Sequence, residues 1–409
     1  MIQNTIFYSD PYKEEFSATV THCAEENGVY LVTLSDTAFY PEGGGQPADT
    51  GFLMNETGNI AQISHVKEAC EAIYHVSDKP LNPGDKVKGV INMSRRRALM
   101  QIHTGEHIVS GLIHTLYGFE NVGFHISPAP AVKELRDQGN DFICTIDTSG
   151  PLDENMLMRI EEEANRAIWR NIPVRTPFYT EDDVKDKEYR SKKELSGVIR
   201  LVNIEGVDVC ACCGLHTRTT GEVGMIKILD SQVYKKGNRI TLACGAGALY
   251  DYRRKNQELL AISQRLSAKP HEALKAFEQL EESKRALQYE MYSCEERLMD
   301  LLIASAQGDN ISCPIFNMPN ASTELIRRLA LKGVDKFRLC VAFTVCDESI
   351  RFAVSSAGED LKAISQGINA QGGRCGGRAP IIQGATPCTI EELTGILSSL
   401  GYIVKAINF

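Results

Sequence analysis

The chain has 409 residues and a mass of 45.2 kDa, a length that predicts two to four domains. Its composition, 43% hydrophobic and 24% charged, is that of an ordinary globular protein and excludes wholesale disorder, a collagen-like fold and a coiled coil over the whole length. The net charge of −9 argues against a purely electrostatic nucleic-acid binder, so any contact with nucleic acid must use local basic patches or a specific pocket.

The sequence indicates neither a membrane span nor a secretory signal. No run of 18 or more apolar residues occurs, and the first sixteen residues lack the basic and apolar regions of a signal peptide. We therefore expect a cytoplasmic protein whose 13 cysteines are mostly reduced. Clusters among these cysteines then suggest a metal site or catalysis rather than disulfides.

Residues 1–93 are predicted to form a small β-barrel. Short alternating runs at 18–22 and 28–34 are typical of strands and are separated by turn-rich segments. The glycine-rich stretch 40–47, with sequence YPEGGGQP, interrupts these strands as a loop. A turn at 82–85 leads into a further strand.

Residues 94–247 are predicted to form a compact unit of mixed helices and strands. Apolar positions from Leu99 to Leu116 recur with helical spacing, with Ser94 as the expected N-cap and Gly118 as the stop. The other expected elements are strands at 142–146, 199–204 and 223–229 and a helix at 153–172, ended by Pro173.

The last 160 or so residues divide into an extended helical segment and a final compact unit. Residues 248–305 carry spaced leucines among dense charges, which predicts two helices in a hairpin or coiled-coil arm. A helix packed on its own domain and a seam between two chains fit this pattern equally well. Residues 306–409 are predicted to be an α/β unit, with paired strands at 337–343 and 350–354, helices at 360–369 and 389–400, a glycine-rich loop at 372–379 and a strand at 402–405. The expected fold class is α+β and multidomain.

Four side chains form the strongest chemical signal. His103 and His107 lie four residues apart, so both imidazoles stand on one face of the expected helix and can reach one ion. Cys212 and His216 repeat this spacing about a hundred residues later. Two histidines, a cysteine and a histidine are the nitrogen and sulfur ligands that Zn²⁺ prefers. Cys210 is the most credible substitute for Cys212 as the sulfur ligand.

A metallopeptidase is a weak alternative for this motif. In the pattern H-E-x-x-H the glutamate follows the first histidine directly and serves as the base. Here Glu106 instead adjoins the second histidine, so it is expected to be a solvated carboxylate or one that supports the ligands.

The ordered motifs resemble the editing domain of alanyl-tRNA synthetase and the free-standing AlaX-type editing proteins, in their long form. The segments that carry the resemblance are Gly43–Pro47, His103–His107 and Cys212–His216. The family's last signature is typically Cys-Gly-Gly-Thr-His, and here Cys213 replaces the first glycine and Leu215 the threonine. The glycine-rich stretch 372–378 resembles a motif of the DHHA1 domain, a tRNA-binding domain at the C-terminal end of these synthetases. The chain contains no Asp-His-His triplet, so a DHH phosphoesterase is not implied.

The resemblance implies a hydrolase that removes serine or glycine from mischarged tRNA-Ala, with one Zn²⁺ per chain. Selecting a seryl over an alanyl ester requires a partner for one hydroxyl group, and Gln46 and Thr104 are the candidates. The loop glycines Gly43, Gly44 and Gly45 would allow close approach of the backbone to the 3′ end of the tRNA.

Contacts with the RNA backbone are expected from two arginine-containing segments. The first is Arg95, Arg96 and Arg97, shortly before His103, although a charge run is equally often a solvated face. The second is 326–378, where nine lysines and arginines stand against five aspartates and glutamates. Its glycine-rich part contributes Gly372, Gly373, Arg374, Gly376, Gly377 and Arg378.

Two other function classes stay open at this point. A non-catalytic tRNA-binding protein with a structural zinc would need no pocket with Gln46 and Thr104. A synthetase that charges tRNA would need an ATP-binding motif, and we recognise none. A homodimer through the helical arm or the last unit is a further expectation.

Overall fold

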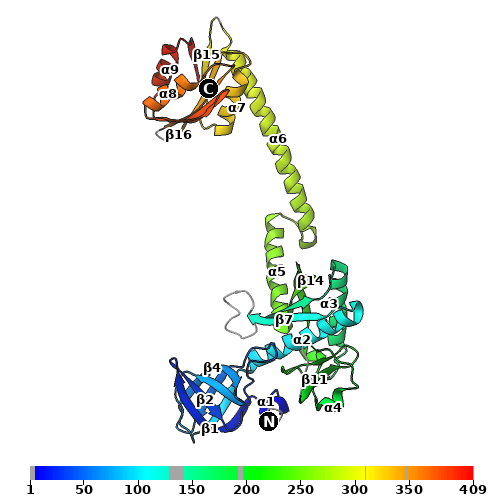
Figure 1. Cartoon of the computed structure of the whole chain (residues 1–409). Coiled ribbons are helices and arrows are strands. Elements are labelled where there is room, and N and C mark those ends of the chain that lie inside the picture. Colours follow the sequence, from blue (N-terminus) through cyan, green and yellow to red (C-terminus); the bar gives the residue numbers. More distant parts are fainter. Residues whose placement is uncertain (1–4, 129–141, 192–196, 309, 347–348, 409) are drawn as a thin grey trace. The chain divides into compact units, whose positions relative to one another are not determined.

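The computed structural model describes residues 5–128, 142–191, 197–308, 310–346 and 349–408. The chain folds into two compact units, Met1–Ala261 and Ile262–Phe409 (Figure 1). Within the described residues, no helix is both long and apolar enough to cross a membrane.

The first unit begins with the short helix α1 (Ile6–Ser9) and a closed six-stranded barrel. Around the barrel the strand order is β1-β2-β5-β4-β3-β6. Alternate side chains such as Phe16, Leu53 and Val66 point inward and form its core, so the predicted barrel is confirmed. The strands are β1 (Glu15–Glu26), β2 (Val29–Leu34), β3 (Gly51–Asn55), β4 (Ile60–Ala69), β5 (Ala72–Ser77) and β6 (Lys86–Ile91).

Helix α2 (Met93–Tyr117) follows the barrel directly and is the central element of the unit. Its N-cap is Asn92, whose side chain accepts a hydrogen bond from the backbone of Arg95, so the expected cap at Ser94 was wrong. Gly118 ends the helix in the left-handed conformation, as predicted. The helix is buried on nearly every side between residues 99 and 113, because neighbouring elements surround it.

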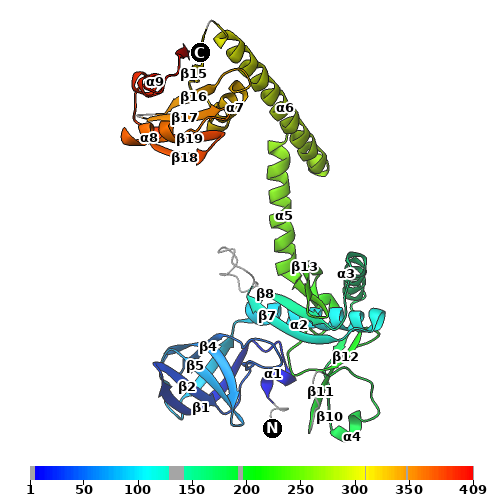
Figure 2. The ribbon, with the colours of Figure 1, turned by 45° about the horizontal axis from the view of Figure 1, so that its top comes forward.

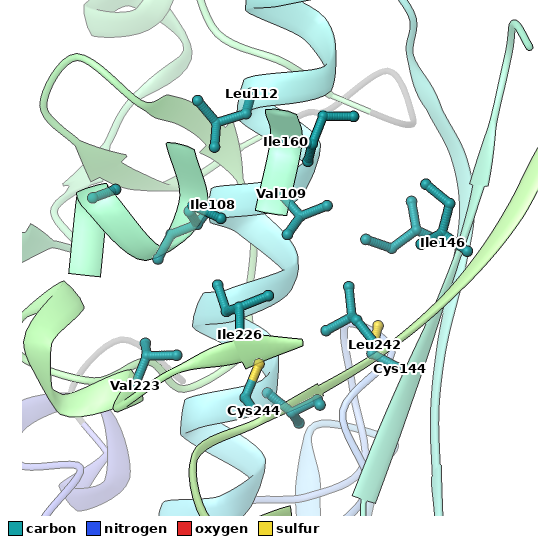
Figure 3. Close-up of a cluster of buried hydrophobic side chains, with 14 of the residues drawn as sticks. Ile108, Val109, Leu112, Cys144, Ile146, Ile160, Val223, Ile226, Leu242 and Cys244 are labelled. Atoms are coloured by element: carbon teal, nitrogen blue, oxygen red, sulfur yellow. The ribbon is translucent and has the colours of Figure 1, made fainter. Parts of the chain in front are cut away.

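Two antiparallel sheets and a second helix enclose α2. One sheet has the order β13-β14-β8-β7, and in the other β11 pairs with β10, β12 and β9. Side chains from α2, α3, β8, β13 and β14 converge in a shared apolar core (Figure 3). The elements are β7 (Asn121–Pro128), β8 (Phe142–Thr148), α3 (Glu154–Trp169), β9 (Val174–Arg175), β10 (Phe178–Tyr179), α4 (Glu181–Val184), β11 (Ile199–Ile204), β12 (Asp208–Ala211), η3 (Thr220–Val223), β13 (Ile226–Tyr234), β14 (Gly237–Cys244) and α5 (Gly245–Arg265).

The second unit contains η4 (Pro270–Glu272), the long helix α6 (Ala273–Ala306) and a six-stranded sheet of order β18-β19-β17-β16-β15-β20. Helix α7 and the end of α6 cover one face of the sheet, and α8 and α9 cover the other (Figure 2). The remaining elements are β15 (Cys313–Asn317), α7 (Thr323–Gly333), β16 (Leu339–Cys346), β17 (Ser349–Ser356), α8 (Lys362–Ala370), β18 (Arg374–Arg378), β19 (Ile381–Thr386), α9 (Ile390–Ser399) and β20 (Val404–Asn408).

The glycine-rich segment 372–379 differs from its prediction as a loop. Residues 374–378 form the edge strand β18, antiparallel to β19. Gly384 of β19 permits this pairing, because a Cβ there would lie only 1.9 Å from the carbonyl oxygen of Arg374. Helices do occupy the predicted arm, as α5 and α6, but their pairing stays a prediction.

Candidate metal centre and adjoining pocket

The candidate site begins with two histidines on the buried face of α2. His103 and His107 lie one helical turn apart, and their ring centroids are 5.4 Å from each other. Both side chains are almost fully buried, so their polar atoms require partners inside the protein.

The segment that follows β12 brings a thiol and a third imidazole to the same place. The ring of His216 lies 4.6 Å from that of His103 and 4.8 Å from that of His107, between centroids. The Sγ of Cys212 lies 3.4 Å from Nε2 of His103. One ligand atom from each of these four residues lies within 4.8 Å of the others, so they fit a single metal ion.

Each of the three imidazoles contacts a polar partner through its Nδ1 atom. Nδ1 of His103 lies 2.9 Å from Oε1 of Gln46. Nδ1 of His107 lies 2.9 Å from Oδ2 of Asp208, and Nδ1 of His216 lies 3.3 Å from Oγ1 of Thr104. Such contacts fix the tautomer that leaves Nε2 free to bind a metal.

The observation that best fits a metal ion is the environment of Nε2 of His216. This atom is buried and has no hydrogen-bond partner within the described residues. A buried nitrogen without a partner costs free energy unless something binds it, and a metal ion at the centre of the four residues would do so.

The glycine-rich loop of the barrel positions the side chain of Gln46 against His103. Gly44 and Gly45 have positive φ angles, and the backbone of Gly43 and Gln46 exchanges two hydrogen bonds, so the loop makes a tight turn. Through this turn Oε1 of Gln46 accepts a second hydrogen bond from the backbone of Leu215, at 3.0 Å. The sequence motif in the barrel and the one after β12 are thereby joined.

Gly214 is required by the close approach of the loop to the imidazole. A Cβ at this position would lie 2.1 Å from Cε1 and 2.3 Å from Nδ1 of His103. No side chain fits at that distance unless His103 moves.

The charges around the site favour the metal-binding forms of Cys212 and His216 but not that of His107. Burial by itself raises the pKa of the Cys212 thiol, but the neighbouring imidazoles, above all that of His103, hold it well below its usual value. Burial lowers the pKa of His216 far below its usual value, which keeps this imidazole neutral. A thiolate and neutral imidazoles are the forms that bind a metal. Burial lowers the pKa of His107, but Glu106 and Asp208 raise it well above its usual value, so a metal must displace a proton from this imidazole.

Cys210 is less suitable than Cys212 as the sulfur ligand. His107, Asp208 and Cys210 also lie close enough together to hold an ion. However, both Oδ atoms of Asp208 accept hydrogen bonds from Arg190, at 2.8 and 2.9 Å, and Oδ2 also contacts His107. The donor set with Cys212 therefore fits a metal better.

A cavity of about 550 Å³ adjoins this centre on the side of His107 and Cys212. Glu106 forms part of its wall and is only 3% exposed, so it is not a solvated carboxylate. Its Oε1 accepts hydrogen bonds from Ser110 and Asn121. The other lining residues are Gly44, Gly45, Gly123, Phe124, Arg190, Ser191, Val198, Ile199, Arg200, Cys210, Ala211 and Cys213.

The two candidates for substrate recognition are both fully buried. The hydroxyl of Thr104 accepts a hydrogen bond from the backbone of Thr217, at 3.1 Å, besides contacting His216. Gln46 keeps one polar atom, Nε2, that has no partner within the described residues. Direct contact of either side chain with a substrate stays a prediction.

The three arginines before His103 occupy three different environments. Arg97 is exposed, and Arg95 is half-buried with its Nε bonded to the carbonyl oxygen of Ala48. Arg96 is fully buried and forms an ion pair with Asp49 of the barrel. The expectation that Arg96 contacts phosphate was therefore wrong, because a side chain in the protein core cannot reach RNA.

The arginines of the last unit are placed differently. Arg374 and Arg378 are exposed on the edge strand β18, and Gly376 between them has open space around it. Gly372 and Gly373 precede the strand, and Gly377 lies within it at a positive φ. RNA contact at these residues stays a prediction.

Sequence reasoning missed Asp208 and Arg190, the pair that holds His107. Asp208 begins β12 only two residues before Cys210, and this proximity to the cysteine motif was the available signal. Arg190 lies in a charged segment with no motif, so nothing in the sequence marked it.

Two protein families match parts of the chain. The family described as tRNA synthetases class II (A) matches residues 5–95. The family described as the threonyl and alanyl tRNA synthetase second additional domain matches residues 199–241, which include Cys212 and His216.

Curated relatives extend over more of the chain. The alanyl-tRNA editing protein Aarsd1-A of Xenopus laevis is 33% identical over 284 residues, which cover 68% of this chain and 64% of that protein. The alanyl-tRNA editing protein AlaX-L of Pyrococcus horikoshii is 32% identical over 252 residues, covering 60% and 58%. An alanine–tRNA ligase of Ignicoccus hospitalis is 27% identical over 97% of this chain and 43% of the ligase. The chain thus spans less than two thirds of the length of each of these relatives.

Among solved structures, the C-Ala domain of alanyl-tRNA synthetase from Aquifex aeolicus is 19% identical over 23% of this chain and 92% of that domain. The TM-score of this match is 0.20, which is too low to support an inference. The matched domains and the editing relatives agree with the motifs and the site geometry. The chain thus carries domains of the class II (A) and the threonyl and alanyl tRNA synthetase families, and across much of its length it is similar to proteins named alanyl-tRNA editing proteins.

Proposed function

We propose that the protein hydrolyses the ester bond of mischarged tRNA-Ala in trans, with seryl- and glycyl-tRNA-Ala as substrates. The observation that carries this proposal is the set His103, His107, Cys212 and His216, which has a buried unpaired nitrogen at its centre and a cavity beside it. The names of the editing relatives support the same substrate class.

The donor set fits one Zn²⁺ per chain, because three imidazoles and a thiolate are ligands that zinc prefers and their ligand atoms lie within 4.8 Å of one another. Bound there, zinc would supply a Lewis acid that polarises an ester carbonyl or orients a water. An aminoacyl ester is intrinsically reactive, so positioning and charge stabilisation supply much of the rate enhancement that hydrolysis requires.

The chain's own residues hold the site in a fixed geometry. Gln46, Asp208 and Thr104 orient the three imidazoles through their Nδ1 atoms. We assign Thr104 to this positioning role, since its hydroxyl already has protein partners. Nε2 of Gln46 is the unpaired donor nearest this group among the described residues, and we keep it as the candidate for a substrate hydroxyl group. Because Gln46 is fully buried and does not line the cavity, such a contact requires the glycine-rich loop to move.

The cavity beside His107 and Cys212 is the proposed seat of the aminoacyl group. Its volume of about 550 Å³ is in the range of small-molecule sites, so it can accept a small amino acid with part of the terminal adenosine. The ring of Phe124 lines the cavity and offers a surface on which a base can stack.

Contacts with the body of the tRNA are proposed for the exposed arginines. Arg97 in the first unit and Arg374 and Arg378 on β18 are solvent-facing positive charges in an acidic chain. The glycine-rich strand resembles the DHHA1 motif, which supports a role in tRNA binding for the last unit. A cytoplasmic location, where tRNA is charged and edited, is part of the same proposal.

A non-catalytic tRNA-binding protein with a structural zinc is the second candidate. A metal held by four protein ligands is typical of structural sites, and this observation favours that candidate. The cavity that reaches His107 and Cys212 is the observation against it, since a structural zinc requires no access.

A comparison of adjacent cysteines tests the proposal. Cys212→Ala should lose the metal and abolish hydrolysis of seryl-tRNA-Ala, whereas Cys213→Ala, whose thiol is exposed beside it, should keep the metal and most of the activity. Metal content is measured by mass spectrometry and hydrolysis by release of labelled serine. Wild-type protein with one zinc per chain but no hydrolysis would support the structural-zinc alternative. Retention of the metal by Cys212→Ala would contradict the assignment of the ligands.

A further inference from the structure

Glu106 is a buried carboxylate in the wall of the cavity that adjoins the metal centre. It is 3% exposed, and it is the one carboxylate among the described residues that line this cavity. A buried carboxylate costs free energy unless hydrogen bonds or a cation compensate its charge. The partners of its two oxygens therefore indicate what this side chain can bind.

The two carboxylate oxygens of Glu106 have different environments. Oε1 accepts hydrogen bonds from the hydroxyl of Ser110, at 2.8 Å, and from the side-chain amide of Asn121. The amide of Asn121 also donates to the hydroxyl of Ser110, at 2.9 Å, so the three side chains hold one another in place. Oε2, by contrast, accepts no hydrogen bond from any described residue, so it is the oxygen left for a ligand.

Oε2 of Glu106 lies beside the metal centre. It is 3.7 Å from Nε2 of His107, which is the ring nitrogen left to bind a metal because Nδ1 contacts Asp208. A nitrogen that binds a metal has no proton to share with a carboxylate. With a metal bound, Oε2 of Glu106 is therefore without a hydrogen-bond donor on the described part of the protein.

The two guanidinium groups in the cavity wall are engaged elsewhere. Arg190 donates to both carboxylate oxygens of Asp208, at 2.8 and 2.9 Å. Arg200 donates to two backbone carbonyl oxygens of the segment after β12, at 3.0 and 2.6 Å. No described lysine or arginine forms an ion pair with Glu106. A substrate that brings a further cation into this cavity therefore needs Glu106, the one carboxylate in the described part of its wall.

We infer that Oε2 of Glu106 binds the α-ammonium group of the aminoacyl ester, an inference that rests on the proposed function. The ammonium group of an aminoacyl-tRNA donates the charge-assisted hydrogen bonds that a carboxylate accepts. In such an ester the nitrogen and the carbonyl carbon are two bonds apart, about 2.5 Å. Because Oε2 lies so close to His107, an ammonium bound there places the ester carbonyl beside the four candidate metal ligands.

This contact narrows the substrate class. A seryl or glycyl ester with a free α-amino group presents a cation to Glu106. An N-acylated or peptidyl ester presents a neutral amide instead, which leaves the buried carboxylate without its partner and weakens binding. The site therefore accepts aminoacyl-tRNA and discriminates against peptidyl-tRNA.

A pair of stable analogues tests the contact. Both are acceptor-stem minihelices of tRNA-Ala that end in 3′-amino-3′-deoxyadenosine, so that an amide replaces the reactive ester. One carries serine and the other L-glyceric acid, in which a hydroxyl group replaces the ammonium. Their Kd values are measured with the zinc-loaded, full-length protein by fluorescence anisotropy. The wild type should bind the seryl analogue about 10- to 100-fold more tightly, because the glyceryl analogue lacks the charged hydrogen bond.

Glu106→Gln separates the charge of this side chain from its packing. The variant keeps an oxygen that can accept hydrogen bonds from Ser110 and Asn121. It should raise the Kd of the seryl analogue about 10- to 100-fold and leave that of the glyceryl analogue unchanged. Glu120→Gln is the matched control: Glu120 is an exposed carboxylate that pairs with His114 and does not line this cavity, so both Kd values should stay as in the wild type. Mass spectrometry should show that both variants keep their zinc.

Three results would contradict the inference. Equal weakening of both analogues in Glu106→Gln, or loss of its zinc, would make Glu106 a support for the metal ligands alone. Equal binding of the two analogues by a wild type that hydrolyses seryl-tRNA-Ala would overturn the ammonium contact and leave the proposed function in place. A wild type that neither binds the analogues nor hydrolyses seryl-tRNA-Ala would overturn both.

Discussion

Removing the buried arginine of α2 is expected to destabilise the barrel without affecting tRNA contact. Nε of Arg96 lies 3.0 Å from Oδ2 of Asp49, and the guanidinium also donates to the carbonyl oxygens of Pro11 and Ala38. Both charged side chains are essentially inaccessible to solvent. The pair therefore connects the start of α2 to the barrel at a position where water cannot replace either partner.

The magnitude follows from the carboxylate that would be left behind. In Arg96→Met, Oδ2 of Asp49 would keep only its hydrogen bond from the backbone of Tyr40, at 2.6 Å. Removing one partner of a buried ion pair costs about 3–5 kcal/mol, because the other charge stays buried and uncompensated. The double variant Arg96→Met/Asp49→Asn removes both charges, so it should recover part of that loss.

Hydrogen exchange of peptides from β1–β6 in the full-length protein measures the free energy of opening of the barrel. Arg97→Met is the matched control: it removes an exposed charge at the next position and should change stability by no more than about 0.5 kcal/mol. Conversely, Arg97→Met should lower the salt dependence of tRNA binding, and Arg96→Met should not. An Arg96→Met protein with an unchanged barrel but a smaller salt dependence would refute the reasoning and make Arg96 a phosphate contact.

Three further substitutions test separate parts of the account. Burial lowers the pKa of His75 from 6.5 to about 4, so as the pH falls the unfolded chain takes up a proton that the folded barrel excludes. The free energy of unfolding should therefore fall by about 3 kcal/mol between pH 6.5 and pH 4. Urea unfolding of His75→Gln should show a smaller loss over that range than the wild type. Gly214→Ala should displace the ring of His103 and reduce the metal content, as measured by mass spectrometry, while the far-ultraviolet circular dichroism spectrum stays unchanged. Thr104→Val should lower metal affinity about 10–100-fold, because Nδ1 of His216 loses its hydroxyl partner. If the variant keeps its full metal content and the ratio of seryl to alanyl hydrolysis changes, the Thr104 hydroxyl contacts the substrate instead.

The sequence predicted features that depend on local spacing. Alternation along short segments indicated the barrel, and the four-residue spacing of His103 and His107, repeated in Cys212 and His216, indicated a metal-binding group. These patterns can be recognised in the sequence because the turn of a helix and the pleat of a strand bring together side chains that are only a few residues apart in the chain.

Features that depend on contacts between distant segments were not predictable. Gln46 was predicted only as a partner for a substrate hydroxyl group, but it is buried and contacts His103 and Leu215 because the segment after β12 packs over the glycine turn. Arg96 looked like one of three surface charges, and only the position of Asp49, 47 residues earlier, makes it a core residue. Similarly, the glycine-rich stretch 374–378 becomes a strand because β19 offers it a partner without an obstructing side chain.

Deacylation of three charged forms of tRNA-Ala by the purified full-length protein tests the central claim most directly. Seryl-, glycyl- and alanyl-tRNA-Ala are each incubated with the zinc-loaded protein, before and after treatment with a chelator. We expect hydrolysis of the seryl and glycyl esters, little hydrolysis of the alanyl ester, loss of activity with the chelator and its return on addition of zinc. Equal hydrolysis of all three esters, or hydrolysis that persists after the metal has been removed, would contradict the proposal that the site of His103, His107, Cys212 and His216 edits tRNA-Ala.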